Sequence, residues 1–259
     1  MLNMQKIKSW ILDMRMLLRS IPSPVVAFFI LSVVVMNLLA NKTVVNLPWL
    51  ALDGGFFVSW LAFLTMDIIV RRYGPSAANK VNVFAIVTNL FASLIFILIA
   101  MIPTEDDYSG FNSIFGGTWF ILLSSTIAFL LSGLVNNFLN WGIGQTFKKN
   151  PNGKLAFFSR SYISTFIGQF VDNMVFGCLT FMVFGPIFWG PETAWSFLQC
   201  FMAAVTGAVA ELLAEVLFSP IGYHVCKKWE EDGIGNDYFA FRESLKQNSN
   251  SADFKTMEA

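Results

Sequence analysis

The chain has 259 residues, of which 55% are apolar and only 13% are charged. A soluble domain carries about a quarter of its residues as Asp, Glu, Lys or Arg, so most of this surface must face something other than water. The formal net charge of zero argues against a nucleic acid as partner. His224 is the single histidine, which argues against a metal cluster built on histidines. Cys178, Cys200 and Cys226 lack metal-site or disulfide spacing and predict small buried apolar groups.

Residues 1–23 predict a basic amphipathic helix on the cytoplasmic face of a membrane. Lys6, Lys8, Arg15 and Arg19 are interspersed with apolar side chains such as Trp10. The segment has neither the long apolar stretch nor the small-residue cleavage site of a signal peptide. We therefore expect this helix to lie along the interface before the first span.

Six apolar stretches follow, each close to the ~20 residues that a helix needs to cross the hydrocarbon core. They cover approximately residues 24–40, 48–70, 81–102, 115–139, 161–187 and 194–219. Pro103, Pro186 and Pro220 lie where three of these helices are expected to end, because proline cannot continue a helix. The sequence thus predicts an all-α membrane protein with six transmembrane helices in residues 24–226. A polar cytoplasmic tail, 227–259, is expected to be partly disordered, above all at 247–251.

Basic residues orient the predicted spans. With six spans, Lys42 is the only one of the seventeen Lys and Arg residues that falls on the outer side. The outer loop after the third stretch carries Glu105, Asp106 and Asp107 instead. Because cytoplasmic loops carry the excess of Lys and Arg, both termini are predicted to be cytoplasmic, in a multi-pass protein of the bacterial inner membrane.

The fifth stretch carries the clearest polar signal. A carboxylate at mid-membrane costs about 3 kcal/mol on insertion scales, so it usually faces a cavity or a partner. Gln169, Asp172 and Asn173 lie at three- and four-residue spacing and share one face of a helix. Small residues alone on that face would be typical of helix packing, whereas the amides and the carboxylate together favour a ligand cavity.

Other carboxyl groups leave two interpretations open. Asp67 lies one turn before Arg71, so both an ion pair at the cytoplasmic end and a substrate role remain open. Glu211 and Glu215 are four residues apart on a helix rich in Ala and Gly. That face favours either tight packing, with Glu215 protonated or paired to a base, or a polar cavity. The chain has no phosphate-binding GxxxxGK[ST] motif, and we expect neither an enzyme activity nor a cofactor or metal.

Two blocks of residues occur in order within this frame. The first comprises Asn41-Lys42, Gly55, Phe57, Asp67, Arg71, Tyr73-Gly74 and Ala77, and the second is Ser164-Thr-Phe-Ile-Gly-Gln-Phe-Val-Asp172-Asn173-Met-Val-Phe176. Together they resemble the VUT, or queuosine precursor transporter, family of bacterial membrane proteins over about residues 28–226. The chain departs from that family at Trp60, where a proline is common, and at Asn137, where a carboxylate is frequent.

The resemblance implies uptake of a 7-deazaguanine precursor of queuosine, a base used to modify tRNA. A carboxylate can accept the adjacent N–H donors of a guanine-like edge, and amides can satisfy its carbonyl. The flat ring suits stacking on aromatic side chains. We expect the substrate to be bound by these residues, in decreasing order of preference: Asp172, Gln169, Asn173, Asp67, Asn41 and Glu211.

Three classes of function remain open. The first is a secondary carrier for a deazapurine base. The second is the substrate-binding membrane subunit of an importer of the energy-coupling-factor type, driven by ATP. The third is a non-transporting membrane scaffold or an intramembrane enzyme, which the buried carboxylates and the missing catalytic groups respectively disfavour. The expected partners are a small-molecule substrate, the lipid bilayer and either a second copy of the chain or an energy-coupling module, but no nucleic acid.

Overall fold

The structure is a computed structural model that describes residues 2–40, 42–47, 49–103, 119–147, 153–188 and 190–257, together with Gly110, Asn112 and Phe115. Its helices are α1 (Leu2–Ser20), α2 (Ser23–Leu39), α3 (Phe56–Tyr73), α4 (Pro75–Ala100), α5 (Trp119–Thr146), α6 (Lys154–Gly177), α7 (Gly185–Phe188), α8 (Phe197–Glu231) and α9 (Asn236–Met257). A π-helix, Cys178–Phe184, joins α6 to α7, and a 3₁₀ turn, Pro191–Thr193, precedes α8. Strands β1 (Thr43–Leu47) and β2 (Leu50–Asp53) form an antiparallel hairpin.

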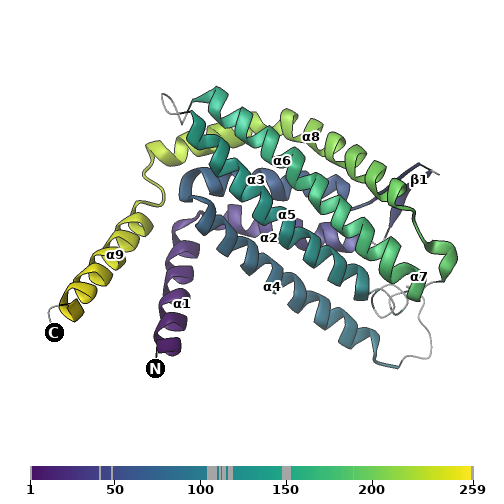
Figure 1. Cartoon of the computed structure of the whole chain (residues 1–259), viewed down its shortest axis with the longest axis horizontal. Helices are drawn as coiled ribbons and strands as arrows, with labels where there is room; N and C mark the ends of the chain where they lie inside the picture. Colours follow the sequence, from purple (N-terminus) through teal and green to yellow (C-terminus); the bar gives the residue numbers. More distant parts are fainter. Residues whose placement is uncertain are drawn as a thin grey trace.

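The long helices form one tilted bundle (Figure 1). The hairpin and α7 lie at one end of this bundle, which we call the hairpin end, and α1, α9 and both chain termini lie at the other, the terminal end. Helix α1 meets α2 at an angle of 107°. An angle near 90° is what a helix lying along an interface would make with one that enters the membrane.

Four helical segments in the described ranges are long and apolar enough to cross a membrane. They are α4, α5, the continuous segment from α6 to α7, and α8, with a fifth if α1 and α2 form one broken span. Helix α2 has only 17 residues, and α3 carries Asp67, Arg71 and Arg72 within 18 residues. The structure thus supports a polytopic membrane protein, while the six-span topology with cytoplasmic termini remains our interpretation.

The second predicted span begins later than expected. Residues 50–53 are in the hairpin, and the helix starts only at Phe56. A Cβ on Gly54 would lie 2.8 Å from the backbone oxygen of Leu39, so this position requires glycine where the chain turns into α3. The helix ends at Tyr73, because Gly74 adopts a φ of +83°.

The prediction that Pro220 ends the sixth helix was wrong. Helix α8 continues through it to Glu231. Proline cannot donate to the carbonyl four residues earlier, Val216, but the Ser219 hydroxyl lies 3.4 Å from that oxygen and donates to it. A nearby Ser hydroxyl can therefore donate to the carbonyl oxygen that proline leaves without a backbone donor, as is common in membrane helices.

The fifth predicted helix is longer than expected at its start, since α6 begins at Lys154. It also runs through the π-helix and past Pro186 to Phe188, so that proline does not terminate it immediately. In the tail, helix α9 covers Asn236–Met257, and the expected partial disorder remains a prediction. Tyr238 in its first turn is 3% exposed, and Arg72 Nε donates to the carbonyl oxygen of Ile234, just before this helix, at 2.6 Å.

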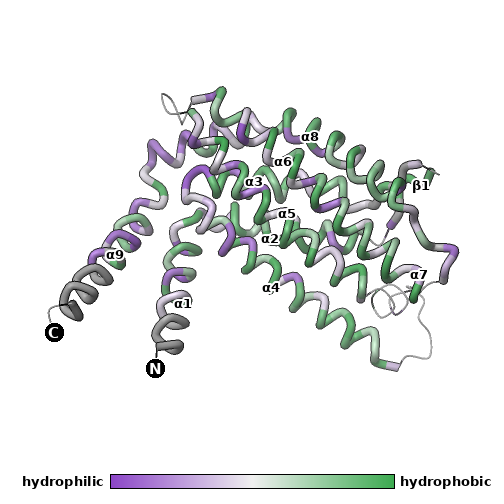
Figure 2. Tube along the Cα trace, viewed as in Figure 1, coloured by the Kyte–Doolittle hydropathy of each residue, from purple (hydrophilic) through white to green (hydrophobic). Residues whose placement is uncertain are grey.

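Polar and apolar residues are arranged as expected for a bundle surrounded by lipid. Figure 2 shows α4 as apolar along most of its length, and its exposed residues include Phe91, Leu94 and Leu98. The interior instead holds polar side chains that are at most 2% exposed: Asn37, Asp67, Asn82, Asn89, Asn136, Asn137, Gln169, Glu211 and Glu215 among others. Polar groups at this depth need partners or a cavity, and their positions lead to the candidate site.

Candidate functional site

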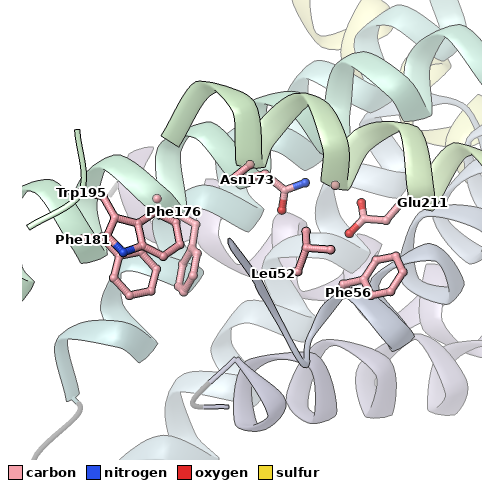
Figure 3. Close-up of a pocket in the computed structure, with 10 residues that line it drawn as sticks. Leu52, Phe56, Asn173, Phe176, Phe181, Trp195 and Glu211 are labelled. Atoms are coloured by element: carbon pink, nitrogen blue, oxygen red, sulfur yellow. The ribbon is translucent and has the colours of Figure 1, made fainter. Parts of the chain in front are cut away.

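A cleft lies between α6, α8 and the hairpin (Figure 3). One part of its wall is aromatic and another is polar. The lining residues are Leu52, Phe56, Asn173, Phe176, Gly177, Phe181, Trp195, Ala203, Gly207 and Glu211.

The aromatic wall is built by the π-helix and the segment before α8. Trp195 stacks on Phe181 with ring centroids 4.0 Å apart and an interplanar angle of 10°. Phe176 meets Phe181 edge to face at 6.0 Å. The Trp195 backbone N–H donates to the Phe181 carbonyl at 3.1 Å, which fixes the stack. π-helical turns within α-helices are frequent at functional sites, and this one turns Phe181 toward the cleft.

The polar wall is formed by Glu211 of α8 and Asn173 of α6, whose side chains point toward one another in Figure 3. Glu211 Oε1 accepts a hydrogen bond from Ser59 Oγ of α3 at 2.6 Å. The Asn173 Nδ2 group is buried and has no hydrogen-bond partner among the described residues. A Cβ on Gly207 would lie 2.6 Å from Asn173 Nδ2, so glycine at this position leaves the amide its space.

Asp172 lines a second hollow that adjoins the cleft. The two share Phe56, Asn173, Phe176 and Glu211. Asp172 Oδ1 accepts a hydrogen bond from Ser132 Oγ of α5 at 2.7 Å. Adjacent residues of α6 thus present a carboxylate and an amide to the second hollow.

A second group of polar residues lies deeper, toward the terminal end of the bundle. Asp67 accepts hydrogen bonds from Asn136 Nδ2 at 3.0 Å and from Ser161 Oγ at 2.5 Å. Ser161 Oγ also lies 2.7 Å from Glu215 Oε1. We call Asp67 and Glu215 the carboxyl pair, and the Ser161 hydroxyl lies between them. None of these three residues lines the cleft or the adjoining hollow.

The ion pair between Asp67 and Arg71 that helical spacing left open is not the arrangement observed. Arg71 Nη2 lies 3.8 Å from Glu230 Oε1, and its guanidinium lies over the rings of Phe157 and Tyr223 at 5.0 and 5.3 Å. Asp67 instead faces α5 and α6, because it points into the bundle while Arg71, one turn later, meets the end of α8.

The six expected substrate residues separate into three groups. Asp172, Asn173 and Glu211 lie around the adjoining cleft and hollow. Gln169 is completely buried and lies one turn before Asn173 on α6. Asp67 is also completely buried and lies farther toward the terminal end of the bundle. Asn41 lies outside the described residues. Whether any of them binds substrate remains a prediction.

Sequence reasoning did not single out Phe181, Trp195 or Ser59 as site residues. Trp195 reads as part of an interfacial aromatic belt, because many Trp residues near span ends have that role. The π-helix that aligns Phe181 with Trp195 has no signature in the amino-acid pattern. Ser59 lies within a largely apolar helix, and its role depends on Glu211, 152 residues away.

Comparison with known proteins identifies a family for this chain. A sequence profile of the vitamin uptake transporter family matches residues 53–225, which include α3 to α8 almost completely. No curated protein and no solved structure shows significant similarity to the chain. In the part of the chain that the structure describes, no cluster of His, Cys, Asp and Glu has the geometry to hold a metal ion.

Proposed function

We propose that this chain, which belongs to the vitamin uptake transporter family, imports a 7-deazaguanine-type precursor of queuosine across the bacterial inner membrane. Family membership and the apolar helices support a multi-pass membrane transporter. The identity of the substrate is the part that we add. It rests on the chemistry of the cleft and on the two motif blocks.

The observation that supports this substrate is a carboxylate and an amide opposite an aromatic stack in one cleft. A guanine-like edge offers adjacent N–H donors and a carbonyl acceptor. Glu211 and Asp172 supply acceptors, and the Asn173 Nδ2 group supplies a donor that has no other partner among the described residues. Trp195 and Phe181 offer a flat surface against which a bicyclic ring can stack.

The two departures from the family pattern leave this site intact. Asn137 Nδ2 donates to Asn79 Oδ1 of α4 and does not line the cleft. Trp60 stacks on Phe218 with ring centroids 4.2 Å apart, also away from the cleft. The substitutions therefore change helix contacts rather than the groups that we expect to bind the base.

For the alternative, a subunit that docks on an ATP-driven module, the small residues of α8 are a candidate docking surface. Gly207 and Ala203 line the cleft instead, and Ala204 and Ala208 are completely buried. This arrangement favours a carrier that works alone. Copurification of an ATPase with the chain would reverse that preference.

The test is the queuosine content of tRNA in a bacterial strain unable to make the precursor, with limiting external precursor and with or without this chain. We expect expression to restore queuosine. The Asp172→Asn variant should abolish the restoration, whereas Asp237→Asn, an exposed change in α9, should retain it. The amount of each variant in the membrane is measured in parallel.

Cyano, aminomethyl and free-base forms of the precursor are supplied in separate cultures to identify the substrate. Absence of queuosine with all three forms, despite normal membrane levels, would contradict the proposal. Wild-type restoration by Asp172→Asn would remove Asp172 from the binding site.

A further inference from the structure

The carboxyl pair has a hydrogen-bond geometry that requires an additional proton. Asp67 and Glu215 are both completely buried, and both contact the single hydroxyl of Ser161, at 2.5 and 2.7 Å. A hydroxyl carries one proton and can donate it to one carboxylate. The second contact is a hydrogen bond only if that carboxyl group is itself protonated and donates to Ser161 Oγ.

The charged groups around the carboxyl pair also indicate that the pair holds one proton. Arg160 of α6 interacts with Asp67, and Arg71 of α3, which lies near Arg160, is paired with Glu230 of α8. With the two arginines and Glu230 charged, one proton on the carboxyl pair makes this buried cluster neutral. Cys226 of α8 also lies near these charged groups. Helix α5 contributes the uncharged Asn136 and Asn140 beside Asp67. Two adjacent buried carboxyl groups cannot both ionise without a large cost.

Several buried polar atoms without hydrogen-bond partners lie between the carboxyl pair and the cleft along α6. They are Glu215 Oε2, both amide atoms of Gln169, and Asn173 Nδ2, none of which has a hydrogen-bond partner among the described residues. Ser161, Thr165, Gln169 and Asn173 are spaced four residues apart along about 18 Å of α6. Buried polar atoms of this kind usually bind ordered water, and hydrogen-bonded water is a path for protons.

We propose that Asp67 and Glu215 share one exchangeable proton across Ser161, and that this proton is the coupling ion that drives uptake of the base bound in the cleft. The inference rests on the proposed function, since it assigns the energy source of that transport. The proton enters along the polar side of α6, binds the carboxyl pair, and leaves toward the terminal end of the bundle. Only O–H bonds form and break, as the proton passes from water to a carboxylate and from there back to water.

The structure also provides a means of coupling. Glu215 lies one turn from Glu211, which lines the cleft, on the same helix. Loss of the proton leaves two carboxylates around one hydroxyl, which repel each other and favour a different packing of α3, α6 and α8. A ligand or proton that interacts differently with two packings shifts the equilibrium between them, and the effects of proton and base on each other are reciprocal.

The experiment uses the purified full-length chain in liposomes with tritiated 7-cyano-7-deazaguanine as the probe. With an acidic exterior, we expect accumulation that a protonophore abolishes, and acidification of the lumen reported by a trapped pH-sensitive dye when the base is added. A gradient of one pH unit supports about tenfold accumulation at one proton per base. Accumulation that is unaffected by the protonophore would contradict proton coupling.

Counterflow separates this inference from the proposed function. Exchange of labelled for unlabelled base needs binding and movement of the site but no net proton transfer. We expect Glu215→Gln to lose gradient-driven accumulation while retaining counterflow, which also shows that the variant is folded. Glu231→Gln, a change at an exposed residue of the same helix, is the matched control and should behave like the wild type.

Each outcome has a separate meaning. Absence of counterflow of every base form in the wild type would contradict the proposed function itself. Wild-type counterflow together with gradient-driven accumulation in Glu215→Gln would overturn the proton site and leave the proposed substrate intact.

Discussion

The cleft and the carboxyl pair contain similar groups in opposite settings. In the cleft, Glu211 and Asn173 face an open space bounded by an aromatic stack. In the carboxyl pair, Asp67 and Glu215 are enclosed and share the Ser161 hydroxyl. The polar groups of the cleft border a hollow lined by aromatic rings, whereas those of the carboxyl pair contact one another through a single hydroxyl.

This difference shows why residue type alone does not assign a role within the membrane. Glu211 and Glu215 are separated by one helical turn, about 6 Å, and their spacing places both on one face of the helix. Glu211 is at most 2% exposed, yet its carboxylate borders the cleft beside Asn173. Glu215 is turned toward α6 and does not. The neighbouring helices therefore decide which carboxyl group meets the substrate.

The largest expected effect separates these two glutamates. We expect Glu211→Gln to weaken binding of the base by about 10- to 150-fold, because a hydrogen bond to a charged group contributes roughly 1.5–3 kcal/mol. Glu215→Gln should leave the dissociation constant within about threefold of the wild-type value. Equilibrium binding of the labelled base to purified protein measures both. Equal losses of affinity in the two variants would mean that the two regions form one binding site.

A smaller effect is expected in the aromatic wall. Trp195→Ala removes a stacking surface, and aromatic pairs contribute ~0.5–1.5 kcal/mol beyond area burial, so the dissociation constant should rise about 2- to 12-fold. Trp60→Ala is the matched control, because Trp60 makes a comparable stack with Phe218 outside the cleft. A greater loss of affinity in the Trp60 variant than in the Trp195 variant, measured in the same binding assay, would place the base elsewhere.

The smallest effect concerns the space around Asn173. In Gly207→Ala the new Cβ would approach Asn173 Nδ2 to 2.6 Å, and the amide can rotate away at modest cost because it is the end of a flexible side chain. We expect a several-fold loss of affinity with little change in thermal stability. Gly142→Ala, which meets no atom within 4 Å, is the control. Unchanged affinity in Gly207→Ala would exclude Asn173 from direct contact with the base.

Several features could be predicted from the amino-acid sequence. Apolar stretches predicted most of the long helices, since a helix in lipid must satisfy its own backbone hydrogen bonds. The first span agrees with α2 to within a residue or two. The motif blocks predicted the family that the profile match confirms. The spacing of Gln169, Asp172 and Asn173 predicted a shared polar face of α6, and two of them, Asp172 and Asn173, line the second hollow.

Other features required the tertiary structure. The hairpin before α3 and the passage of α8 through Pro220 depend on contacts with Leu39 and on the Ser219 hydroxyl. Local propensity does not encode such contacts, which arise only when separate elements meet.

The sequence by itself determined a membrane protein of this family, because hydropathy and motif order are properties of the chain alone. Only the tertiary structure decided which buried carboxyl groups border the cleft and which share a hydroxyl. The physical reason is that the interior of a bundle surrounded by lipid is built from side chains of several helices. Asp67, Ser161 and Glu215 come from three such helices, and their meeting within hydrogen-bond distance follows from how those helices pack.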